Sequence, residues 1–127
     1  MIKQVFDIES FWKVVVYYNI DYNFFDDIAL ELRMASISER IINEVWDTLS
    51  FGEARAVTCN SLEQHISIVL FNSHSSEADY INSIVHEATH VMQAMLRAYK
   101  VKDEGEPPAY TVGYIVMKMY EVFRKFI

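Results

Sequence analysis

The longest helical pattern in the chain lies between Ser75 and Leu96, and it constrains the fold more than any other segment. Ser75 or Ser76 can cap the start of a helix, because a serine hydroxyl accepts a hydrogen bond from an unpaired amide of the first turn. Beyond this cap, apolar residues recur at the spacing of one broad helix face: Ile81, Ile84, Val85, Ala88, Val91, Met92, Met95 and Leu96. We therefore expect a long helix whose apolar face covers a core.

Two segments are rich in the β-branched and aromatic residues that strands favour. They span Trp12–Tyr18 and His65–Phe71, and a shorter strand-like run, Ala54–Cys59, precedes the second of them. Because only a short turn separates that run from His65–Phe71, the two can pair as a hairpin or lie in one small sheet.

Two further helices are expected between the first strand and this pair. Residues 21–34 mix helical and alternating spacing and are interpreted as a short helix. Ser36–Glu39 has the S-x-x-E form in which both side chains can satisfy unpaired amides at a helix start. The apolar residues that follow recur at helical spacing, which predicts an amphipathic helix of about 12 to 14 residues that ends near Gly52.

A last helix is expected after residue 106. Pro107 and Pro108 suit its first turn, where a missing amide hydrogen has no consequence. Tyr110–Phe123 is apolar almost all round, as a buried helix would be. The whole chain, residues 1–127, is therefore expected to form a single α+β domain, mainly helical, with a short β-sheet packed on the longest helix.

Composition excludes several classes of function. Eleven Lys and Arg against 18 Asp and Glu give a net charge of −7, which argues against nucleic acid as a partner. The chain has one cysteine, Cys59, no segment with the pattern of a signal peptide and no apolar run long enough to cross a membrane, so we expect a cytoplasmic protein without a membrane partner. The three glycines stand far apart, which excludes phosphate-binding loops.

The longest helix contains the sequence H-E-x-x-H at His86, Glu87 and His90. Two histidines four residues apart lie on the same helix face one turn apart, close enough to bind one Zn²⁺ ion. Zinc lowers the pKa of a bound water, and a neighbouring carboxylate such as Glu87 can take the proton and return it to the leaving amine. The motif therefore predicts a zinc site with Glu87 as general base.

A catalytic zinc needs a third protein ligand, and the sequence offers acidic residues downstream. The metzincin pattern requires a glycine and a histidine where the chain has Gln93 and Leu96, so that subclass is excluded. If the helix ends near residue 100, the chain has moved about 15 Å beyond His90, and six extended residues span at most about 20 Å. Glu106 can therefore return to the site, whereas Asp103 and Glu104 fall short unless the helix ends earlier. Glu104 stays the alternative third ligand.

The segment from Val85 to Val91, followed by the E-x-x-A-Y sequence at Glu106–Tyr110, resembles the HExxH zincin metallopeptidases of the glutamate-ligand (gluzincin-like) type, and in particular short metallopeptidases encoded by phages and prophages. The resemblance covers residues 80–115. It implies a minimal zincin-like domain, a zinc ion held by His86, His90 and Glu106, and hydrolysis of a peptide bond with Glu87 as base. A zinc-stabilised binding module without catalysis is the alternative.

Three secondary expectations complete this interpretation. In zincins an edge strand beside the active-site helix binds an extended substrate, and Ile66–Phe71 is the expected equivalent, with a plain core strand as the alternative. Tyr110 is a candidate donor to the oxyanion that develops during catalysis. The expected partner is a peptide or protein substrate, with a partner chain or a homodimer through the last helix left open.

Overall fold

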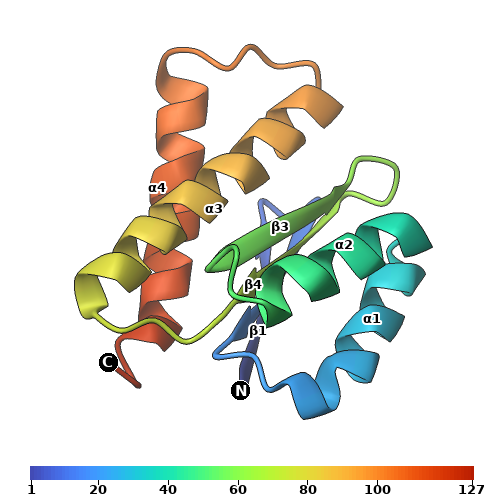
Figure 1. Ribbon diagram of the computed structural model, residues 1–127. Helices are drawn as coiled ribbons and strands as arrows, with labels where there is room; N and C mark the ends of the chain where they lie inside the picture. The colour runs from blue at the N-terminus through green and yellow to red at the C-terminus, as the bar shows by residue number, and fades with distance from the viewer.

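The computed structural model describes residues 1–127 and contains four strands and four α-helices (Figure 1). In chain order the elements are β1 (Ile2–Ile8), β2 (Trp12–Tyr18), a 3₁₀ turn (Tyr22–Phe24), α1 (Phe25–Met34), α2 (Glu39–Ser50), β3 (Ala56–Ser61), β4 (Ile66–Phe71), α3 (Glu77–Ala98) and α4 (Glu106–Phe123). The expected α+β class is confirmed.

The four strands form one mixed sheet in the order β1-β2-β4-β3. The β1–β2 and β3–β4 pairs are antiparallel hairpins, and β2 and β4 lie parallel at the centre. Both central strands are buried along most of their length, which explains their nearly continuous apolar sequences, because a strand covered on both faces has no solvent side. The edges of the sheet are therefore β1 and β3.

The sheet separates two apolar cores, and successive side chains of each central strand point alternately into one core and into the other. On one face Val14, Val16 and Val69 pack against α3 and α4, and on the other face Val15 and Ile68 pack against α1 and α2. Figure 1 shows α3 and α4 on one side of the strands and α1 and α2 on the other. The long helix α3 thus lies directly over the sheet, as its broad apolar face predicts.

The start of α3 follows the sequence closely. The Ser76 hydroxyl accepts a hydrogen bond from the amide of Asp79, so Ser76, one of the two candidate serines, is the N-cap. The helix runs to Ala98, slightly short of the expected end. Its 22 residues give a length of about 33 Å, enough to cross the whole sheet.

Two local features differ from the sequence-based expectations. The N-cap of α2 is Ser38, whose hydroxyl accepts from the Ile41 amide, whereas Ser36 has a left-handed backbone conformation with φ of 66°. The expected capping box at Ser36 is therefore wrong by two residues. Strand β1 was not expected, because its turn into β2 uses Glu9 and Ser10 at φ of 51° and 66° instead of the usual Asn-Gly or Gly pair.

Helix α4 is buried on only one side, and the prediction of an all-round buried helix is wrong. Its buried positions form a single face, which consists of Pro108, Thr111, Ile115, Met119 and Phe123. The opposite face carries apolar residues that are exposed, among them Tyr110, Met117 and Tyr120. The helix occupies the outer flank of the molecule, where one side contacts α3 and β1 and no element covers the other (Figure 1).

Candidate metal centre

His86 and His90 converge on the exposed side of α3. Their Nε2 atoms lie 3.2 Å apart, and the two rings meet edge to face with centroids 4.8 Å apart. Two nitrogens at that separation, each 2.0 to 2.1 Å from one ion, subtend an angle of about 100° at the ion, close to the tetrahedral angle that zinc adopts. The separation of the two nitrogens is therefore compatible with both imidazoles binding one zinc ion.

Glu87 lies beside the histidines but is buried. The residue is only 4% exposed, and its Oε1 accepts a hydrogen bond of 3.0 Å from the Thr58 hydroxyl on β3. Its other oxygen, Oε2, lies 3.9 Å from Nε2 of His86. One carboxylate oxygen is thus held by the sheet, and the other faces the histidine pair.

Sequence reasoning missed Thr58 because the contact spans 29 residues and depends on β3 being the edge strand next to α3. Part of the contact can be predicted from the sequence, because neighbouring side chains of a strand point to opposite faces of the sheet. Cys59 packs in the core on the α1–α2 side, so its neighbour Thr58 has to face α3. Which α3 residue it meets follows only from the three-dimensional packing.

Cys59 is close in sequence to this site but is not a suitable ligand. It is buried on the opposite face of the sheet from α3. Burial, followed by the negative charge of Glu87, raises the pKa of the Cys59 thiol to about 12. Without a metal the thiol therefore stays protonated at neutral pH. Its place on the far face of the sheet is what excludes it as a ligand, because a bound metal deprotonates a thiol that it can reach.

The two remaining histidines are held by other partners. The Nδ1 and Nε2 atoms of His74 lie 2.7 Å from the Asn72 carbonyl and from the Ser83 hydroxyl, respectively. His65 Nδ1 lies 2.9 Å from the Tyr99 hydroxyl, which also donates to the Phe11 carbonyl. Neither imidazole belongs to the His86–His90 pair, in agreement with the sequence, whose spacing singles out only the motif histidines.

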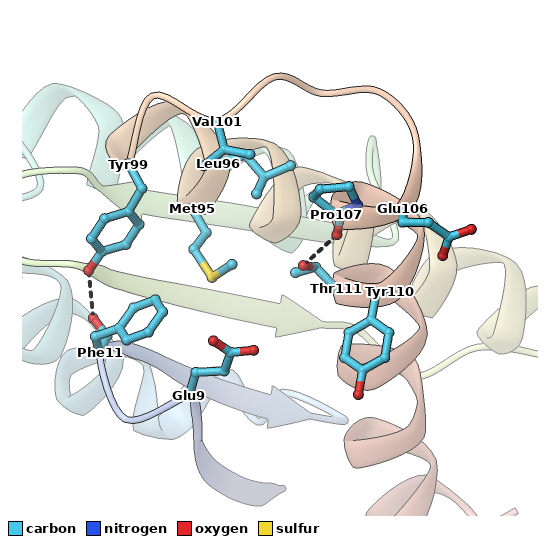
Figure 2. A pocket seen from close by; sticks show the side chains of 10 residues that line it. All are labelled: Glu9, Phe11, Met95, Leu96, Tyr99, Val101, Glu106, Pro107, Tyr110 and Thr111. Atoms are coloured by element: carbon cyan, nitrogen blue, oxygen red, sulfur yellow. Dashed lines mark hydrogen bonds between the residues drawn. The ribbon is translucent and has the colours of Figure 1, made fainter.

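The structure does not bring the expected third ligand to the pair. No group of three or more His, Cys, Asp or Glu side chains converges to hold a metal. Glu106 is the first residue of α4 and lines a pocket of about 520 Å³ together with Met95, Leu96 and Tyr99. At about 100° per residue, these three α3 residues lie about 120° to 180° around the helix from His90. Figure 2 shows the Glu106 carboxylate pointing away from that pocket.

The loop is long enough to bring Glu106 back to His90, but whether it does so depends on the side of α3 on which the chain returns. That side is set by packing, because Ile115 and Met119 of α4 share a core with Ala88 and Met92 of α3. The alternatives Asp103 and Glu104 lie exposed in the connecting loop and do not join the histidines. A third ligand from this acidic segment thus stays a prediction.

Tyr110 also lies away from the position that an oxyanion donor needs. It is 71% exposed and lines the same pocket as Glu106, with Glu9 of the β1–β2 turn across from it (Figure 2). Its placement follows from its position one turn after Glu106 on the outer side of α4. The geometry therefore gives no support to a catalytic role for Tyr110.

The strand expected to bind an extended substrate is not an edge strand in the structure. β4 (Ile66–Phe71) pairs on both sides, with β2 and with β3, so it is a central strand and the substrate-binding interpretation of it is wrong. The edge strand beside α3 is β3, which carries Thr58. The nearly continuous apolar sequence of β4 is typical of a central strand, and the mixed sequence Ala56–Ser61 suits an edge.

A comparison with protein-family models finds no match, and searches of curated proteins and of solved structures find no similar protein. None of the helices is long and apolar enough to cross a membrane.

Proposed function

We propose that this protein is a zinc-dependent metallopeptidase, in which His86 and His90 bind the metal and Glu87 is the general base. The observation that carries the proposal is the approach of the two Nε2 atoms to 3.2 Å beside a carboxylate that Thr58 holds by one oxygen. Two ligands and a base within five residues of one helix are the arrangement that the chemistry needs.

Each residue of this group has a separate task. Zinc, when bound, polarises a carbonyl and makes water acidic enough to lose a proton near neutral pH. The free oxygen of Glu87 faces the histidines and can accept that proton and pass it to the leaving amine. Thr58 is a positioning residue, because its hydrogen bond fixes which oxygen is free.

A polypeptide substrate fits the surroundings of the pair. The His86 side chain is 68% exposed, so a long chain can reach it without the opening of a lid. The free edge of β3 lies beside α3 and presents unpaired backbone groups, to which an extended peptide can add as a further strand. The proposal therefore assigns substrate binding to β3 in place of β4. A cytoplasmic location is part of it and fits the single unpaired Cys59.

A purely structural role for zinc is less well supported. Both histidines belong to one helix, so an ion bound by these two residues alone would not join separate elements of the fold. The two apolar cores on either side of the sheet close without it. A metal that supplies folding free energy usually ties together segments that would otherwise be unstable. These features favour the catalytic proposal over a zinc-stabilised binding module.

The test combines metal analysis with a peptide-library cleavage assay. We expect one zinc per chain in the wild type, loss of zinc in His86→Ala and in His90→Ala, and retention in the matched control His65→Ala. Glu87→Gln should keep the metal and lose cleavage. Zinc binding that persists in both motif variants would overturn the site, and cleavage that persists in Glu87→Gln would overturn the mechanism. Zinc bound without cleavage of any library peptide would instead support the binding module.

The same assay decides the third ligand. If Glu106 moves to the metal when zinc binds, Glu106→Gln lowers zinc affinity, whereas Glu104→Gln leaves it unchanged. If both variants bind zinc as the wild type does, the third protein ligand comes from neither residue. A crystal structure with zinc bound would then identify the group that completes the site.

A further inference from the structure

One exposed stripe of α4 has the spacing of a helix–helix interface. Its members follow each other at alternating steps of four and three residues, and all are exposed: Glu106, Tyr110, Gly113, Met117, Tyr120 and Arg124. At about 100° per residue they fall within an arc of about 80°, opposite the buried face of α4. Arg124 continues the stripe beyond the last helical residue because its backbone is still helical, with φ of −59° and ψ of −18°. A repeat of 3.5 residues is the pattern by which helices pair over a long distance.

Gly113 at the middle of this stripe is not required by the fold. A glycine inside a helix is less favourable than alanine by about 1 kcal/mol. A Cβ atom added at Gly113 would meet nothing within 4 Å, and the residue has no positive φ. Its lack of a side chain instead leaves a depression, which adjoins a groove of about 320 Å³ lined by Ile81, Met117 and Tyr120 among others. A small residue at this point allows a second helix to approach closely.

The order of residues along the stripe is complementary to itself in the antiparallel direction. With a two-fold axis at residue 115, Glu106 lies opposite Arg124 of a second copy, Tyr110 opposite its Tyr120, and Gly113 opposite its Met117. Each of these pairs occurs twice in a symmetric dimer. Neither Glu106 nor Arg124 has an ion-pair partner within its own chain. We propose that α4 is a homodimer interface, in which two copies pair antiparallel through this stripe.

Charge and shape select this arrangement over others. Parallel pairing would place Glu106 against Glu106 and Arg124 against Arg124, which is repulsive at both ends. The antiparallel dimer brings opposite charges together at both ends and places each Met117 side chain against the space above Gly113. A membrane surface is a poorer occupant, because the net charge of −7 opposes binding to anionic lipid.

Sedimentation velocity over a range of concentrations tests the interface. We expect the wild type to dimerise reversibly and Arg124→Glu to weaken the dimer about tenfold or more, because two ion pairs become two repulsions. Lys125→Glu is the matched control, since it makes the same change of charge about 100° further round the helix and should leave the dimer intact. The double variant E106R/R124E exchanges the two charges and should restore dimerisation.

Several results would overturn the proposal. A wild type that stays monomeric at its highest soluble concentration would do so, as would equal weakening by Arg124→Glu and Lys125→Glu, or a double variant that stays monomeric while its circular dichroism matches the wild type. Because Glu106 is also a candidate zinc ligand, these measurements are made on the zinc-free protein, where the readouts are independent of the proposed peptidase activity.

Cysteine cross-linking tests the direction of the helices. Tyr110→Cys and Tyr120→Cys should form a disulfide with each other when the two variants are mixed, and neither should cross-link efficiently alone. In the antiparallel dimer two copies of residue 110 stand about 15 Å apart along the axis, which is too far for a disulfide. Efficient cross-linking of Tyr110→Cys alone would indicate parallel pairing and contradict the proposal.

Discussion

Replacement of Thr58 by valine should destabilise the protein and misplace the proposed base. The change removes the hydroxyl that donates to Glu87 but keeps the size and shape of the side chain. A hydrogen bond to a charged group contributes about 1.5 to 3 kcal/mol, and the Glu87 side chain is only 6% exposed, so water cannot replace the lost donor fully. We expect the free energy of unfolding to fall by about 2 kcal/mol, which for a chain of this length lowers Tm by about 7 °C.

Urea unfolding followed by circular dichroism measures this change, and two further variants interpret it. Thr58→Ser keeps the hydroxyl and removes only a half-buried methyl group, so it should lose less than about 1 kcal/mol. Glu87→Met removes the buried carboxylate, and adding Thr58→Val to it should then have little further effect, because both partners are apolar. If Thr58→Val lowers the free energy of unfolding by the same amount in the wild type and in Glu87→Met, the hydrogen bond does not orient the carboxylate. The assignment of Thr58 as a positioning residue is then refuted.

Other predictions concern the caps, the pH dependence and α4. Burial holds the pKa of His74 below its usual 6.5, so the unfolded chain binds more protons than the folded one as the pH falls below 6.5. The free energy of unfolding should therefore decrease on acidification. In denaturant titrations over the same pH range, the free energy of unfolding of the His74→Gln variant should decrease less. Ser76→Ala removes the cap of α3 and should cost about 1 kcal/mol in the same assay, while an unchanged stability or an equal loss in Ser75→Ala would contradict the cap assignment. Gly113→Ala, measured where the chain is monomeric, should stabilise it by about 0.5 to 1 kcal/mol, and a destabilisation would show that the fold does need this glycine.

The elements that sequence reasoning placed well are those whose signals are local. The central strands β2 and β4 carry nearly continuous apolar runs, and the apolar face and serine cap of α3 lie in or directly beside the helix segment. The unexpected strand β1 depends on a turn made by Glu9 and Ser10, two residues that seldom adopt left-handed backbone conformations. Such a turn cannot be predicted from the local sequence and is seen only in the pairing of β1 with β2.

The residues of the candidate site also fall into two groups, those placed by local spacing and those placed by tertiary packing. His86, Glu87 and His90 are fixed by the repeat of one helix, so their mutual placement follows from their spacing. The positions of Glu106 and Tyr110 depend on the side of α3 along which the chain returns, and that choice is made by the packing of α4. Thr58 could not be assigned because its contact requires the order of strands in the sheet. Local spacing thus predicts the motif, and only tertiary packing determines its surroundings.

The unpaired edge of β3, to which a substrate could add as a strand, also exposes the protein to aggregation. A strand whose outer backbone groups are unpaired is a template for any extended segment, including one from another copy of the same protein. Natural sheets limit such growth with short or charged edges, and β3 has only six residues with no charge among them. Its shortness is then the main protection against fibre-like stacking. Substitutions that lengthen this strand or make it more apolar should lower solubility before they alter the fold.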